Sequence, residues 1–266
     1  MLDYFAQLSA REKCPPKVAT WAALEEFVAR AHAFAAERCA LFPEVLARCD
    51  AVFCDHDGDP SRSNWSHFRP LRVDREEDWS DWLQHFIATS TTGHFSHQLF
   101  SRLAAPSGGF GVPEVLREDT VDDRRADLVI RWQDSTRTHV EVKVGDRSFA
   151  KTVETASSLE KKYPAKQWSH FILLPSEDVR RWDAVDRPQS SIIQVLTWDD
   201  VAVSLRRTLR RKSESRLWRV WAHGFCGLVE QSLLGHPLAD SKKTSLNELA
   251  RRVNQISVMQ RGLEDV

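Results

Sequence analysis

Two short apolar segments with charged residues at matched positions constrain the fold more than any other feature. Residues 125–130 read Arg-Ala-Asp-Leu-Val-Ile, and residues 139–144 read His-Val-Glu-Val-Lys-Val. Branched residues at this density favour strands, and Asp134-Ser135 between them favours a turn. The sequence therefore predicts an antiparallel hairpin of residues 126–132 and 138–144.

The charged residues of this hairpin are expected to lie together. Side chains alternate between the two faces of a strand, so Glu141 and Lys143 should share one face while Val140 and Val142 point into a core. A carboxylate and an ammonium group beside so apolar a strand are costly unless they are compensated. A divalent cation would compensate them, and Asp127 on the neighbouring strand would supply a second carboxylate.

The segments around the hairpin predict a strand–strand–strand–helix–strand order. A first strand is expected at residues 114–118 and a fourth at 168–174, where Pro175 ends it. A helix is expected between the hairpin and the fourth strand, capped by Asp146 or Ser148. Its apolar residues recur at helical spacing: Phe149, Val153, Ala156, Leu159 and Tyr163. A strand at residues 191–197 should follow, and then a helix capped by Asp199.

In this order of elements, Asp127 followed by Glu141-x-Lys143 resembles the PD-(D/E)xK nuclease superfamily. Ala126 stands where the proline that gives the motif its name would be. The resemblance implies an α/β protein with a restriction-endonuclease-like mixed β-sheet core flanked by helices, here with helical N- and C-terminal extensions. It also implies catalytic roles for Asp127, Glu141 and Lys143.

The resemblance further implies a metal cofactor, Mg2+ or Mn2+. Asp127, Glu141 and the backbone carbonyl of Val142 would hold it, and Glu118 on the preceding strand or Glu77 on the preceding helix would complete a second metal site. Lys143 would orient the attacking water and neutralise developing charge, or act as a base. Cleavage would leave a 5'-phosphate and a 3'-hydroxyl.

The chain is predicted to divide into three regions. Residues 1–70 form a helical N-terminal region, residues 71–212 the nuclease-like core, and residues 213–266 a helical C-terminal region. A length of 266 residues, 42% of them hydrophobic, allows one substantial core with appendages.

Nucleic-acid contacts would have to come from local basic patches, because a net charge of -1 excludes the strongly basic class of proteins. Arginines on a helix neutralise phosphates without reading bases. The same residues could equally form an ordinary solvated helix face. The candidates for nucleic-acid binding are Arg124, Arg125, Lys151, Arg206, Arg207, Arg210 and Arg211.

The predicted function is metal-dependent hydrolysis of DNA phosphodiester bonds, in bacterial defence or DNA processing. Two alternatives stay open: a nuclease-fold binding or scaffold subunit with weak or partner-dependent activity, and a nuclease directed at RNA. The helical ends are expected to form a homodimer or to dock the protein on a larger defence or repair complex. Five scattered cysteines and no apolar run of membrane length indicate a cytoplasmic protein without membrane partners.

Two other metal motifs fit their chemistry poorly. Cys49, Cys54, His56 and His67 have no familiar zinc spacing. The acidic residues Asp55, Asp57 and Asp59 imitate the start of a calcium loop, but Ser66 takes the closing position that needs glutamate.

Overall fold

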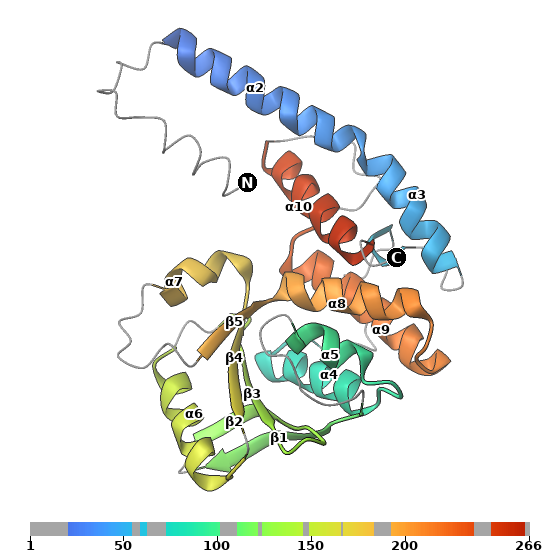
Figure 1. Ribbon diagram of the computed structural model, residues 1–266. Coiled ribbons are helices and arrows are strands. Elements are labelled where there is room, and N and C mark those ends of the chain that lie inside the picture. The colour runs from blue at the N-terminus through green and yellow to red at the C-terminus, as the bar shows by residue number, and fades with distance from the viewer. Residues whose placement is uncertain are drawn as a thin grey trace.

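A five-stranded mixed β-sheet lies at the centre of the computed structural model (Figure 1). The strands follow one another in the order of the chain. They are β1 (Glu114–Val121), β2 (Arg124–Arg131), β3 (Arg137–Val142), β4 (Trp168–Leu174) and β5 (Ile193–Thr197). The structure describes residues 21–54, 59–62, 73–101, 111–121, 124–145, 149–165, 167–183, 193–236 and 246–263.

The sheet is antiparallel at one edge and parallel at the other. β1 pairs with β2 and β2 with β3 in antiparallel register, and β3, β4 and β5 are parallel. Parallel neighbours need a crossover connection, and α6 (Ala150–Lys162) supplies it between β3 and β4. The predicted order of elements, with the hairpin at its centre, is therefore confirmed.

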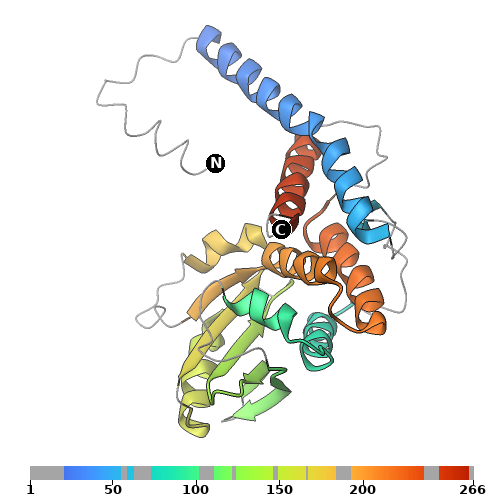
Figure 2. The same cartoon turned by 45° about the vertical axis from the view of Figure 1, so that its right-hand side comes forward.

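Helices cover both faces of the sheet. On one face, α4 (Glu76–Ala88), α5 (His94–Ser101) and α8 (Trp198–Arg211) enclose the larger apolar cluster, which includes Val140 and Val142. On the other face, α6 and α7 (Val179–Asp183) cover a smaller cluster that contains Ile172 and Trp182. Figure 2 shows the same arrangement turned by 45° about the vertical axis. The coarse prediction of a mixed α/β fold with a helix-flanked sheet is confirmed.

Helices at both ends of the chain pack against this centre. The N-terminal pair is α2 (Trp21–Ala40) and α3 (Phe42–Phe53). The C-terminal helices are α9 (Arg216–Leu228), which runs on into a π-helical turn over Val229–Leu233, and α10 (Leu246–Leu263). Buried residues of α3, α9 and α10 belong to the same apolar cluster as the helices on the sheet. The core is thus continuous across the three predicted regions.

The structure corrects some predicted boundaries. β3 ends at Val142, so Lys143 lies just beyond the strand, although Val144 still packs against the larger cluster. Thr197, rather than Asp199, caps α8: its hydroxyl accepts a hydrogen bond from the amide of Asp200, whose carboxylate accepts one from the Thr197 amide. The proposed caps of α6, Asp146 and Ser148, lie outside the described residues.

Among the helices that the structure describes, none is both long enough and apolar enough to span a membrane. The longest, α2, has 20 residues but includes charged side chains along its length, such as Glu25, Glu26 and Arg30. Its apolar side chains Trp21 and Phe27 are exposed to solvent.

Candidate active site

The candidate site lies where β2 and β3 diverge. Leu128 and Val140 form a registered pair, and Asp127 and Glu141 are the next residues of each strand beyond it. The carboxylate of Asp127 accepts a hydrogen bond of 2.8 Å from the backbone amide of Val142. The registered pairing of β2 with β3 ends at Leu128 and Val140, and this side-chain bond connects the two strands beyond it. Asp127 therefore lies beside Glu141, as predicted from the sequence of the hairpin.

Lys143 forms ion pairs with two acids, Glu141 on β3 and Glu76 on α4. Its ammonium group is 3.2 Å from Glu141 Oε1 and 3.3 Å from Glu76 Oε1. The backbone holds it there, because the Lys143 amide donates to the carbonyl of Leu173 and its carbonyl accepts from the indole of Trp198. The structure therefore brings Glu141 and Lys143 together, with Asp127 hydrogen-bonded next to them.

Glu76 is a site residue that the sequence did not reveal. It is the first residue of α4, and its second oxygen accepts from the amide of Val144 at 3.3 Å. The expected acid from this helix was Glu77, one position later. Adjacent helical residues point about 100° apart, so only the packing of α4 on the sheet decides which of the two faces Lys143.

The two central carboxyl groups are held in an environment that disfavours negative charge. Burial, followed by the nearby charge of Asp127, raises the pKa of Glu141 to about 7. Burial also raises the pKa of Asp127, although the Val142 amide and Lys143 oppose the shift. Both groups would gain from an added cation, because a positive charge favours their ionised forms.

Lys143 stays protonated in this setting. Burial by itself would lower its pKa, but Glu141 and Glu76 more than offset that effect and raise the pKa above its usual range. A general base must give up its proton near the working pH. In the described arrangement, Lys143 is therefore suited to orienting a water or a phosphate and to neutralising charge.

The donor set fits a hard cation through a pair of carboxylates. Among the described residues, no group of three or more His, Cys, Asp or Glu side chains is arranged to hold a metal ion. Mg2+, however, is usually held by one or two carboxylates, with water and phosphate oxygens as its other ligands. Glu141 Oε2 is buried and has no hydrogen-bond partner among the described residues, so it is available as a ligand.

Glu77 and Glu118 form ion pairs with arginines. Both lie around Arg125, whose guanidinium is 3.4 Å from Glu77 and 3.5 Å from Glu118. Glu118 also pairs with Arg117 at 3.0 Å. A second metal held by Glu77 or Glu118 stays a prediction, and in the described arrangement both acids pair with Arg125.

The backbone of Glu118 is unusual. It adopts a φ of 55°, a left-handed conformation that is uncommon for residues other than glycine. Arg117 pairs with Leu128 and Asp119 with Ala126, so Glu118 lies opposite Asp127 between these two pairs. The distortion of β1 thus coincides with the position of the central aspartate.

A buried histidine pair lies behind Glu141. His139 Nε2 is 3.9 Å from Glu141 Oε2, and His139 Nδ1 is 3.4 Å from His170 Nδ1. His170 in turn contacts Glu160 on α6 at 3.0 Å. His139 is two residues before Glu141, and this alternation was a signal in the sequence that it shares the face of the acid.

Arg206 does not fit its predicted role in nucleic-acid binding. Its side chain is 2% exposed and forms hydrogen-bonded ion pairs with Asp59 (2.8 Å) and Glu230 (2.5 Å). Such a guanidinium group cannot reach a phosphate on the surface. Arg206 instead ties the segment after α3 to α8 and to the π-helical turn.

The other basic candidates differ in accessibility. Arg207 and Arg210 donate to the carbonyls of Arg261 and Leu263 at the end of α10, where they satisfy unpaired helix carbonyls. Arg125, Arg211 and Lys151 are exposed, and Arg125 is the one that contacts acids of the site rim. The side chain of Arg124 lies outside the described residues.

The alternative metal motifs gain no support. Asp59 is engaged by Arg206, which together with hydrogen bonds from Ser61 holds its pKa below the usual range despite burial. Burial raises the pKa of the Cys49 thiol, which disfavours the thiolate that zinc needs. Cys54 is exposed to solvent, and the other members of those motifs, Asp55, His56, Asp57 and His67, lie outside the described residues.

In comparisons with known proteins, no family model, curated protein or solved structure matches the chain.

Proposed function

We propose that the protein is a metal-dependent nuclease of the PD-(D/E)xK type that hydrolyses DNA phosphodiester bonds. One observation carries the proposal: Asp127, Glu141 and Lys143 gather in a largely buried cluster where the pairing of β2 with β3 ends. The order of strands, with a helix crossing from β3 to a parallel β4, supports the resemblance at the level of topology. Fold alone does not establish activity, so the site must carry the argument.

Asp127 and Glu141 would hold the ion, Mg2+ or Mn2+, and the backbone carbonyl of Val142 stays a predicted third ligand. The ion would supply Lewis-acid stabilisation of the phosphate oxygens and activation of a water. The protein itself contributes the two carboxylates of Asp127 and Glu141. Burial raises the pKa of both groups, and the positive charge of Lys143 only partly offsets this effect.

Lys143 would act on the phosphate and the attacking water. Its protonated ammonium group can donate hydrogen bonds to both and offset negative charge as it develops on the phosphate. The Leu173 carbonyl and the Trp198 indole hold the lysine backbone in place. Positioning of this kind is effective because the group pays little reorganisation cost during the reaction.

The substrate would approach along the exposed arginine at the rim. Arg125 is exposed and lies two residues before Asp127, so a phosphate near the acids could replace Glu77 or Glu118 as its partner. Because carboxylates, lysine and arginine contact the phosphate backbone, they do not by themselves distinguish DNA from RNA. A cleavage assay with matched DNA and RNA is needed to distinguish the two substrates.

The proposal is tested by cleavage of supercoiled plasmid, linear duplex, single-stranded DNA and matched RNA. Each substrate is incubated with Mg2+, with Mn2+ or with chelator, using wild type beside Lys143→Ala and the control Lys161→Ala. Lys161 is an exposed lysine at the end of α6. We expect metal-dependent DNA cutting that only Lys143→Ala loses.

Other outcomes have definite meanings. Preferential cutting of RNA would show that the substrate is RNA and not DNA. Binding of nucleic acid without cutting under any condition would favour a scaffold or a partner-dependent subunit. Cutting by Lys143→Ala at the wild-type rate would overturn the assigned site.

Glu76 offers a sharper test of the geometry than the motif residues do. We expect Glu76→Gln to slow cleavage by about tenfold, because Lys143 loses the negative charge of one neighbouring carboxylate and its position relaxes. Glu77→Gln is the matched neighbour, and it should change the rate by less than about threefold since Glu77 contacts Arg125 instead. Single-turnover rates on one DNA substrate measure both. A larger effect of Glu77→Gln would mean that α4 presents its other acid to the site.

A further inference from the structure

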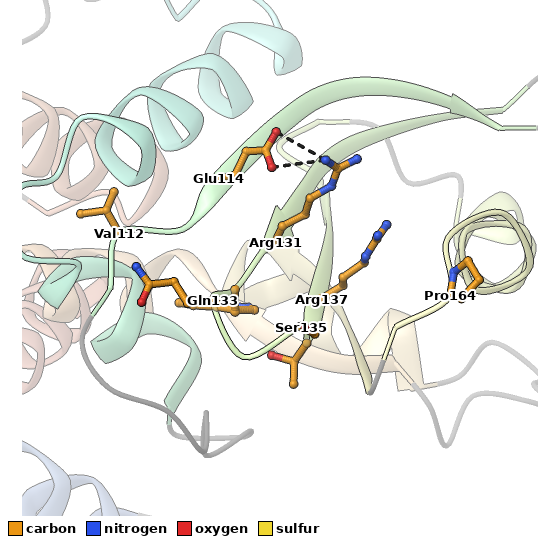
Figure 3. Close-up of a pocket in the computed structure, with 9 residues that line it drawn as sticks. Val112, Glu114, Arg131, Gln133, Ser135, Arg137 and Pro164 are labelled. Carbon is orange, nitrogen blue, oxygen red and sulfur yellow. Dashed lines mark hydrogen bonds and ion pairs between the residues drawn. The ribbon is translucent and has the colours of Figure 1, made fainter.

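A polar pocket lies at the turn end of the hairpin, opposite the end that carries Asp127 and Glu141. Figure 3 shows residues that line it. The pocket has a volume of about 500 Å3 and is lined by the ends of β1, β2 and β3, by the turn between β2 and β3, and by Pro164 after α6. Two of its lining residues are the arginines Arg131 and Arg137. Neither belongs to the predicted site.

The two arginines lie in a row of paired residues across the sheet that contains one acid, Glu114, and two bases, Arg131 and Arg137. Glu114 pairs with Arg131 across β1 and β2, and Arg131 pairs with Arg137 across β2 and β3. Like charges directly opposite one another destabilise a sheet. Glu114 contacts Arg131 at 3.2 Å, so the carboxylate of this row is engaged by Arg131.

Arg137 is stacked on aromatic rings and has no acidic partner among the described residues. Its guanidinium lies over the ring of Tyr163, 4.9 Å from the centroid, and over that of Trp168, at 5.8 Å. Its buried Nη1 atom has no hydrogen-bond acceptor there either. A guanidinium stacked on aromatic rings can still donate hydrogen bonds in its own plane to an oxyanion.

We propose that this pocket binds a phosphoryl group carried by a nucleotide or by a nucleic-acid strand. Two adjacent guanidinium groups can donate several charge-assisted hydrogen bonds to one phosphate, and its charge relieves the repulsion between Arg131 and Arg137. A pocket of about 500 Å3 has room for more than the phosphate. Trp132 and Pro164 in its lining give apolar surface for an attached nucleoside.

The pocket is separate from the acidic cluster. Glu141 lies four positions after Arg137 along β3, which corresponds to about 13 Å at about 3.3 Å per residue. His139 and His170, both buried, occupy the sheet between the two ends. The inference therefore does not depend on nuclease activity, and the pocket can be tested in the absence of metal.

The test is calorimetric titration in the presence of EDTA. The ligands are inorganic phosphate, 5'-AMP, adenosine and an unlabelled oligothymidylate that carries a 5'-phosphate. The proteins are wild type, Arg137→Gln, Arg137→Lys and the control Arg48→Gln, which removes an exposed arginine from α3. Thermal melts of each protein with and without 5'-AMP report folding and binding together.

We expect wild type and Arg48→Gln to bind a phosphorylated ligand with the same affinity and not to bind adenosine. Arg137→Gln should weaken that binding at least about tenfold, and Arg137→Lys by an intermediate factor, because lysine keeps the charge but loses the planar fork. Binding of 5'-AMP would identify a free nucleotide as a source, and binding of the oligonucleotide alone would identify a strand.

Two results would overturn the proposal. One is the absence of binding and of any thermal shift for all phosphorylated ligands. The other is equal affinity of wild type and folded Arg137→Gln. Either result leaves the cleavage experiment unaffected, so failure of this pocket and failure of the nuclease proposal are distinguishable.

Discussion

Glu141→Gln is expected to abolish cleavage and, at the same time, to make the metal-free protein more stable at alkaline pH. Loss of a carboxylate from a two-carboxylate metal site should slow single-turnover cleavage by at least about 1,000-fold. The gain in stability arises because glutamine carries no charge into a buried position, whereas Glu141 does.

The sign of the pH dependence follows from the raised pKa of Glu141. The folded protein holds the Glu141 proton up to a pKa of about 7, against an ordinary value of 4.5. The folded state therefore binds more protons, and its stabilisation is complete below about pH 4.5 and is lost as the pH rises through about 7. Asp127 shifts in the same direction. The expected loss between pH 5 and 8 is about 1–3 kcal/mol for the buried pair.

Urea unfolding in EDTA between pH 5 and 8 measures this slope. Wild type should lose stability across the range, Glu141→Gln should lose less, and Glu37→Gln, on the exposed surface of α2, should follow wild type. A wild-type slope that Glu141→Gln leaves unchanged would show that Glu141 is not buried as an unfavourable charge. Cleavage within tenfold of wild type would remove Glu141 from the proposed site.

Arg206→Ala is expected to destabilise the protein by about 3–5 kcal/mol. The substitution leaves Asp59 and Glu230 facing one another in the interior without a cation, since both side chains are inaccessible to solvent. Burial, only partly opposed by Arg206, already raises the pKa of Glu230, so the variant should recover part of its stability at acidic pH. The reason is that protonation removes the unpaired charge.

Chemical unfolding at pH 5 and 8 tests this prediction, with Arg207→Ala as the matched neighbour. Arg207 is half-buried and donates to one carbonyl of α10, so its removal should cost about 1 kcal/mol. If Arg206→Ala does not fold, Asp59→Asn gives a milder version, which keeps the shape and removes one charge. An effect of Arg206→Ala within 1 kcal/mol of wild type would mean that the ion pairs contribute nothing net.

Local sequence pattern determined the hairpin and its charges. Alternation of apolar and charged residues from His139 to Val144 is a property of the backbone, so it predicted Val140 and Val142 in the core and Glu141 beside Lys143. The helical spacing of apolar residues likewise predicted α6, and Pro175 correctly marked the end of β4. These signals are local, and tertiary packing agrees with them.

Tertiary structure decided every contact between elements distant in the chain. The sequence could not choose between Glu76 and Glu77, because the choice depends on the rotation of α4 against the sheet. Nor could a run of arginines reveal that Arg206 is buried against Asp59, 147 residues away. The opposed arginines Arg131 and Arg137 depend on strand register, which is fixed by the packing of one sheet face and by the turn. Periodicity specifies the direction of a side chain within its element, whereas its partners depend on how the elements pack.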